Sequence, residues 1–118
     1  MCQYAPAFAF LKTLQANRAQ SGGAIHALSS VVATLETSTF EFNTATADGG
    51  AIAWVNSNWT AGLNVTLQLF TSSFISNSAG VDGGAVFVQK TRVEATGSTF
   101  ASNRAGSLNG SGGSGGAL

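Results

Sequence analysis

The apolar positions of this chain recur at a long and nearly constant interval. Four times a large apolar residue stands three places before an asparagine, at Leu14–Asn17, Phe40–Asn43, Phe74–Asn77 and Phe100–Asn103. Successive apolar anchors lie 26, 34 and 26 residues apart, which indicates a unit of 26 residues with one insertion of eight. A unit of this size is typical of a solenoid, in which each repeat stacks only on its neighbours.

Each unit contains three short strand-like runs. The first follows a Gly-Gly-Ala signature that ends in an aliphatic residue, at Gly22–Ile25, Gly49–Ile52, Gly83–Val86 and Gly115–Leu118. The second alternates, with apolar residues at Val31, Ala33, Leu35, Val65, Leu67, Leu69, Val93 and Ala95. Their polar neighbours, such as Thr34 and Thr66, are expected to face water. The third carries the anchor, so the sequence predicts an all-β fold, a single-stranded parallel β-helix of about four coils.

Stacking explains why the same residue types return. Equivalent residues of adjacent coils lie about 4.8 Å apart, so like side chains form columns. Phe40, Phe74 and Phe100 predict an internal aromatic column with Leu14 on its first rung, and the asparagines predict a ladder of bonded amides. The glycine pairs predict a corner where a side chain would clash or where φ is positive. The structural residues expected from the repeat are therefore Phe40, Asn43, Phe74, Asn77, Phe100, Asn103, Gly49, Gly50, Gly83 and Gly84.

The chain divides into three parts within one domain. Residues 1–13 are expected to form a degenerate strand or a capping helix, and the strand is favoured. Residues 14–105 carry the repeats, and residues 106–118 form a Gly-rich loop that leads into an unfinished coil, as expected of a fragment of a longer array. No signal peptide and no membrane span are predicted, because no basic leader and no long apolar run is present.

The insertion falls at 56–63 and predicts a surface loop. Trp59 and Asn56 are the candidates for ligand contact, because exposed aromatic residues stack on sugars or anchor protein partners. The alternative is that Trp59 folds back on its own coil. Three Asn-x-Ser/Thr patterns, at Asn58, Asn64 and Asn109, predict N-glycosylation acceptors if a eukaryote secretes the protein.

Composition removes several function classes. Five basic and five acidic residues give a net charge of zero, which argues against a nucleic-acid partner. A single cysteine excludes a disulfide within the chain, and a single histidine, His26, leaves no structural zinc site. Asp48 and Asp82 share one repeat position and could hold calcium, although an Asp-Gly turn that bonds nearby backbone N–H groups is favoured. No other cofactor is expected.

The Phe-x-x-Asn and Gly-Gly-Ala-Ile signatures, alternating at consistent spacing over about residues 14–118, resemble the polymorphic outer membrane protein repeats of chlamydiae. The resemblance implies a right-handed parallel β-helix like the passenger region of autotransporter adhesins, placed outside the cell or on its surface. Fold alone does not fix a ligand, so the adhesive role is an expectation of class only.

The sequence therefore favours a non-catalytic structural or adhesive segment of a secreted or cell-surface repeat protein. Its expected partners are a host or cell-surface protein or a polysaccharide, and self-association through the open ends is a further expectation. The alternative is a fragment of a carbohydrate-active β-helix enzyme, pectinase-like or lyase-like, with its catalytic coils elsewhere. Glu36, Glu41 and Glu94 are not expected to stack on one another, so an acid pair within this chain is disfavoured.

Overall fold

The computed structural model describes residues 7–10, 13–28, 33–56, 66–106 and 116. All its strands pair in parallel, in four sheets. Sheet A contains β1 (Ala7–Phe10), β5 (Ala33–Glu36), β9 (Thr66–Phe70) and β13 (Arg92–Thr96). Sheet B contains β2 (Thr13–Gln15), β6 (Thr39–Glu41), β10 (Ser73–Ile75) and β14 (Thr99–Ala101). Sheet C contains β3 (Arg18–Ala19), β7 (Thr44–Ala45), β11 (Ser78–Ala79) and β15 (Arg104–Ala105), and sheet D contains β4 (Ile25–Leu28), β8 (Ile52–Val55) and β12 (Val86–Gln89).

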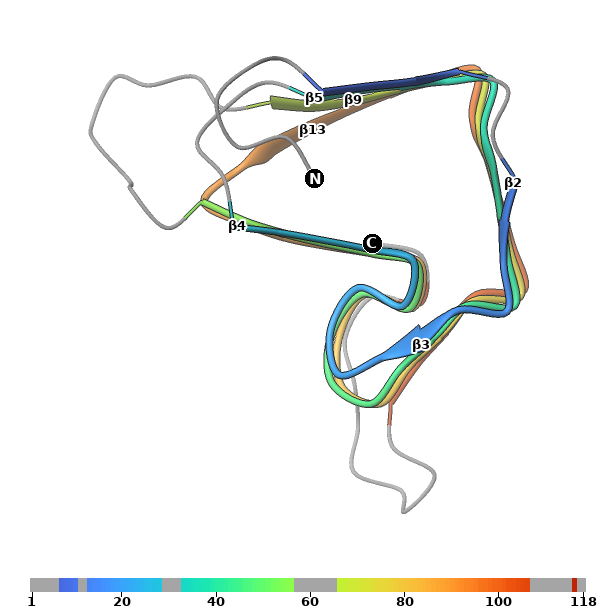
Figure 1. The fold of residues 1–118 in the computed structure, drawn as a ribbon, viewed down its shortest axis with the longest axis vertical. Coiled ribbons are helices and arrows are strands. Elements are labelled where there is room, and N and C mark those ends of the chain that lie inside the picture. Colours follow the sequence, from blue (N-terminus) through green and yellow to red (C-terminus); the bar gives the residue numbers. More distant parts are fainter. Residues whose placement is uncertain (1–6, 11–12, 29–32, 57–65, 107–115, 117–118) are drawn as a thin grey trace.

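The chain visits the sheets in the order A, B, C and D and then begins the next coil. Figure 1 looks along the stack, so that β5, β9 and β13 overlie one another. This arrangement is a parallel β-helix of about four coils, as the repeat predicts. The N-terminal segment contributes a strand, because β1 pairs with β5 in the register Ala7 to Ala33.

Sheet C was not predicted. Its strands follow directly after the repeated asparagines and are two residues long. A run of two residues cannot display a period of two, so the hydrophobic pattern contains no sign of it. Each coil therefore has four straight segments instead of the expected three wherever the structure describes it fully.

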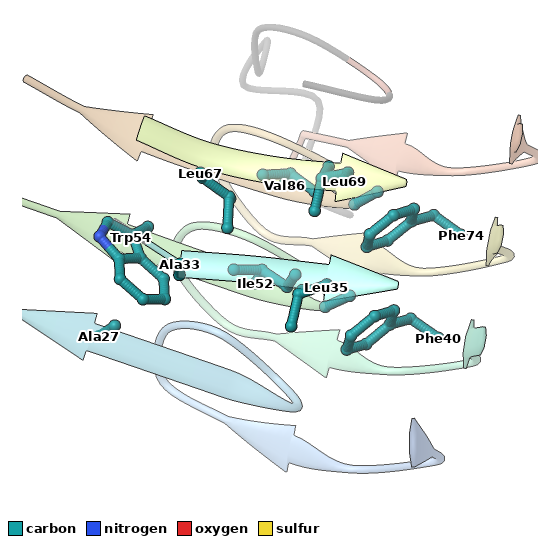
Figure 2. Packing of buried hydrophobic residues seen from close by; sticks show 12 residues of the cluster. Ala27, Ala33, Leu35, Phe40, Ile52, Trp54, Leu67, Leu69, Phe74 and Val86 are labelled. Atoms are coloured by element: carbon teal, nitrogen blue, oxygen red, sulfur yellow. The ribbon is translucent and has the colours of Figure 1, made fainter. Parts of the chain in front are cut away.

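The core lies between the sheets and is built from columns of like side chains. Figure 2 shows Leu35 and Leu69 of sheet A pointing toward Ile52 and Val86 on the opposite side. Phe40 and Phe74 are fully buried, and the rings of Phe40, Phe74 and Phe100 stack with centroids 4.8 Å apart and interplanar angles of 2° and 5°. Burying such a ring contributes about 2 kcal/mol from its area alone. The predicted aromatic column is confirmed, with Leu14 paired to Phe40 on the first rung.

Trp54 also lies in this core, 4% exposed, between Ala27 and Val88 in the column of sheet D. The small side chain of Ala27 leaves room for the indole on one side (Figure 2). The Trp54 Nε1 atom is buried and has no hydrogen-bond partner among the described residues. Its position therefore serves packing and not polar contact.

The inserted residues fall where the interval between anchors predicts. Strand β8 ends at Val55 and β9 begins at Thr66, whereas β12 and β13 are joined only by Lys90 and Thr91. The connection 56–65 is thus eight residues longer than its counterpart. The connection between sheets D and A accommodates this length while the strands on either side keep their register.

Candidate functional site

The repeated asparagines form a continuous ladder inside the corner between sheets B and C. The backbone N–H and the Nδ2 group of Asn43 both donate to Asn77 Oδ1, each at 3.0 Å, and Asn77 donates to Asn103 Oδ1 in the same way. The second Nδ2 hydrogen of Asn77 reaches the Phe40 carbonyl oxygen at 2.9 Å. Asn43 and Asn77 are fully buried and fully bonded. The ladder is structural, because the side-chain polar atoms of these two rungs are already bonded within the stack.

A second ladder, of serines, runs through the corner between sheets A and B. The backbone N–H of Ser38 donates to Ser72 Oγ at 3.2 Å, and that of Ser72 donates to Ser98 Oγ at 3.1 Å. The Ser72 hydroxyl in turn donates to the Phe70 carbonyl oxygen at 3.0 Å. Sequence reasoning missed this ladder, although the signal was present: a serine stands two places before each of the three phenylalanine anchors.

Two corner positions require a left-handed backbone in coil after coil. The residue before the ladder asparagine has φ of 55°, 53°, 53° and 55°, at Ala16, Phe42, Ser76 and Ser102. The residue before the ladder serine has φ of 48°, 49° and 62°, at Thr37, Thr71 and Gly97. Only the last of these is a glycine, so the other side chains are held at a conformational cost. Stacking of the coils supplies the stabilisation that holds them there.

The two glycines of each pair have different tasks. Gly49 has φ of 67° and Gly83 has φ of 61°, a conformation that favours glycine. Gly50 has no such φ, but a Cβ there would collide with the carbonyl oxygen of Gly84 in the next coil. Gly84 is blocked likewise by the carbonyl oxygen of Gly116. Both predicted reasons for the glycine pair are therefore correct: an added Cβ would clash at either glycine, and the first of each pair also has a positive φ.

The aspartates before the glycine pairs occupy stacked turns. Asp48 Oδ1 accepts a hydrogen bond from the backbone N–H of Asp82 at 3.2 Å, and both side chains are half-buried. The carbonyl oxygens of the same residues accept the N–H groups of Gly22 and Gly49 at 2.9 Å. The Asp48 carboxylate thus bonds a backbone N–H group of the next coil, which agrees with the turn interpretation. Within the described residues no group of three or more His, Cys, Asp or Glu side chains lies together, and calcium binding stays a prediction.

Polar side chains on the outside of sheet A form a third, shorter ladder. Thr34 Oγ1 donates to Gln68 Oε1 at 3.0 Å, and Gln68 Nε2 donates to Glu94 Oε2 at 3.3 Å. Arg92 Nε lies 3.4 Å from Glu94 Oε1 in an exposed ion pair. Thr34 and Thr66 were expected to face water, but they are only 7% and 9% exposed. The outward direction of Thr34 is as predicted, and the expectation of solvent exposure is wrong for both threonines.

The glutamates lie in separate columns. Glu36 pairs with Phe70, Glu41 with Ile75 and Glu94 with Gln68. An acid pair for glycoside hydrolysis needs two carboxyl groups facing one substrate at a set separation. The registers agree with the expectation that these three residues do not stack on one another.

The predicted ligand contacts are only partly within the structure. The side chain of Asn56 is 1% exposed and its Nδ2 donates to the Lys90 carbonyl oxygen at 3.3 Å. Its predicted place on the surface is wrong, because it lies directly below Lys90 in the stack and bonds to that coil. Trp59 and the glycosylation candidates Asn58, Asn64 and Asn109 lie outside the described residues. His26 is exposed on sheet D, as the alternation predicts.

Comparisons with known proteins agree with the repeat. No curated protein and no solved structure matched the chain. In the described part of the chain, no helix has the length and apolar character needed to cross a membrane. Residues 71–89 match the family model of the Chlamydia polymorphic membrane protein repeat. This match spans β10, β11 and β12, including the Phe74–Asn77 and Gly83–Val86 signatures. The chain thus forms a parallel β-helix and contains a segment that matches the Chlamydia polymorphic membrane protein repeat.

Proposed function

We propose that this chain is a non-catalytic structural or adhesive segment of a secreted or cell-surface repeat protein. The repeat match at residues 71–89 is the observation that carries the proposal, because the matching family model describes a repeat of membrane proteins. Continuous ladders of Asn, Ser and Phe side chains join the coils into a rigid stack, which supports a role as a display scaffold. The proposed location is outside the cell or on its surface, and the proposed partner is a protein or a polysaccharide.

One column on the outer face of sheet B favours a polar, uncharged partner. Its strands alternate, so residues flanking the buried anchors point outward. One of the two outward columns is made of hydroxyl side chains, at Thr13, Thr39, Ser73 and Thr99, and the other consists of Gln15, Glu41, Ile75 and Ala101. Hydroxyl groups donate and accept hydrogen bonds without a net charge, which suits sugars and polar protein surfaces. The insertion between sheets D and A adds Trp59, whose indole is the proposed anchor.

A direct binding assay tests this function. The 118-residue chain would be labelled and applied to immobilised polysaccharides and to whole cells, with Trp59→Ala as the variant and Phe42→Ala as the control. Phe42 is 55% exposed and lies at the corner between sheets B and C, so its loss removes an exposed aromatic side chain away from the insertion. We expect Trp59→Ala to lose binding about tenfold or more and Phe42→Ala to retain it.

The same assay separates the proposal from the enzyme alternative. A polysaccharide ligand recovered intact agrees with adhesion. New reducing ends, or the ultraviolet absorbance of an unsaturated uronate, would instead assign the chain to the carbohydrate-active enzymes. Equal binding by the two variants would remove Trp59 from the proposal.

A further inference from the structure

The hydrogen bonds from each asparagine to the Oδ1 atom of the next one run in one direction, whereas the second Nδ2 hydrogen donates to a carbonyl oxygen of the preceding coil. At each rung the backbone N–H and Nδ2 groups donate toward the following coil, from Asn17 to Asn43, from Asn43 to Asn77 and from Asn77 to Asn103, all at 3.0 Å. The residue before the ladder donates in the same sense, as Ser76 does to the Ala101 carbonyl oxygen at 2.9 Å. For these bonds, one end of the stack therefore carries N–H donors and the other end carries oxygen acceptors.

Within the described residues, both ends of this corner are edges of the sheets, because sheets B and C begin there at β2 and β3 and finish at β14 and β15. Among the described residues, the backbone N–H groups of Ser102 and Asn103 donate to no acceptor, although their counterparts one coil earlier do. At the opposite edge, Asn17 Oδ1 accepts no hydrogen bond from the described part of the chain. Donors at one edge thus match acceptors at the other.

The apolar column is unfinished at the same two edges. The Phe100 ring packs against Phe74 on one face, at 4.8 Å between centroids, and its side chain remains half-buried. Leu14 at the opposite edge is paired with Phe40 and is likewise half-buried. One more coil would cover the open face of Phe100, and Leu14 at the opposite edge is an apolar side chain that could do so.

We propose that the β14–β15 edge binds the β2–β3 edge of a second copy of this chain, head to tail, in the register that continues the repeat. The Ser102 N–H then donates to the Gln15 carbonyl oxygen, and the Asn103 N–H and Nδ2 groups donate to Asn17 Oδ1. Leu14 of the second copy covers Phe100. A head-to-head joint would bring the Asn103 donors against each other, so the direction of the ladder selects head to tail.

Repulsion between two arginines in one column of sheet C weakens this joint and provides a test of it. Arg18, Thr44, Ser78 and Arg104 share a column in sheet C. In the proposed register Arg104 of one copy lies about 5 Å from Arg18 of the next. Like charges directly opposite weaken strand pairing, so the native joint is weak and limits uncontrolled growth of the stack. Replacing either arginine by glutamate turns the repulsion into attraction.

Sedimentation velocity over a concentration series tests the joint with four proteins: the native chain, Arg18→Glu, Arg104→Glu and the double variant. Both arginines are exposed, so the substitutions leave the core intact, and circular dichroism checks this. Each single variant is expected to associate roughly ten times more tightly than the native chain, and the double variant is expected to return to the native level. In about 1 M salt the differences between the four proteins should collapse, because exposed charges are screened.

This design separates register from net charge. If net charge alone changed the association, the double variant would differ from the native chain in the same direction as the single variants and by more. The proposal is overturned if the single variants associate no more strongly than the native chain, or if the double variant associates as strongly as they do. Trp59→Ala should leave all four results unchanged, so the joint and the proposed ligand contact succeed or fail separately.

Discussion

Asn77→Ala is expected to be among the most damaging single substitutions in this chain. The Asn77 side chain is fully buried at the middle of the ladder. Its Oδ1 accepts from the Asn43 backbone N–H and Nδ2, each at 3.0 Å. Its Nδ2 donates to the Phe40 carbonyl oxygen at 2.9 Å and to Asn103 Oδ1 at 3.0 Å. Alanine removes all four bonds and leaves buried partners on the preceding coil, whereas Asn103 Oδ1 keeps the Asn77 backbone N–H.

The expected loss follows from the partners left behind. A typical hydrogen bond contributes about 1 kcal/mol net, but a buried group left without a partner costs about 1–3 kcal/mol. The Asn43 backbone N–H and the Phe40 carbonyl oxygen both lose a partner through the change. We therefore expect the free energy of unfolding to fall by about 3–5 kcal/mol, a large part of the roughly 5–15 kcal/mol of a whole domain.

Urea unfolding followed by circular dichroism measures this loss. With a slope of about 2 kcal/mol per molar, the midpoint should fall by about 2 M. Asn17→Ala is the matched control, because it removes the same side chain from the exposed end of the same ladder. It breaks only the bond from Nδ2 to Asn43 Oδ1, and its backbone N–H keeps the same acceptor. Its expected cost is about 0.5–1 kcal/mol.

The difference in unfolding free energy between Asn77→Ala and Asn17→Ala tests whether burial of the unpaired groups causes the loss. Equal losses of stability for the two variants would refute the reasoning. Only Asn77→Ala leaves buried groups without hydrogen-bond partners, so it should cost more. A small loss for both would mean that the ladder contributes shape but little stability.

Three further substitutions test the corners. Thr71→Gly should raise the thermal midpoint and add about 0.5–1 kcal/mol, because Thr71 has φ of 49° and the next coil already places Gly97 at this position. Its control is Thr39→Gly, at an extended position of β6, which should lower the midpoint instead. Gly50→Ala should cost more than about 3 kcal/mol by urea unfolding, since the added Cβ meets the Gly84 carbonyl oxygen. Gly97→Ala places its Cβ no nearer than 3.6 Å to Thr71 Oγ1 and should cost only about 1 kcal/mol through its φ of 62°. Equal losses at the two glycines would contradict the proposed clash.

The sequence by itself determined the fold class and the identity of the columns. Phe40, Phe74 and Phe100 hold the same position in successive repeats, and few architectures besides a stack of coils have such a repeat. The asparagine ladder could be predicted in the same way, because the asparagines also hold one position in each repeat and equivalent residues of parallel strands lie one strand spacing apart. The insertion could be placed for the same reason: it lies in the one interval between anchors that departs from the period.

Only the tertiary structure decided what covers each side chain and which of two explanations applies to each glycine. Alternation gives the direction of Thr34, but its burial depends on Gln68 above it, 34 residues away in sequence. Asn56 was placed on the surface because it opens an insertion, yet its amide bonds to Lys90 on the next coil. Gly49 and Gly50 look alike in sequence, whereas the first has a positive φ and the second is required only by the backbone of the next coil. A repeat records which residues are equivalent; contact between coils decides what each equivalent residue does.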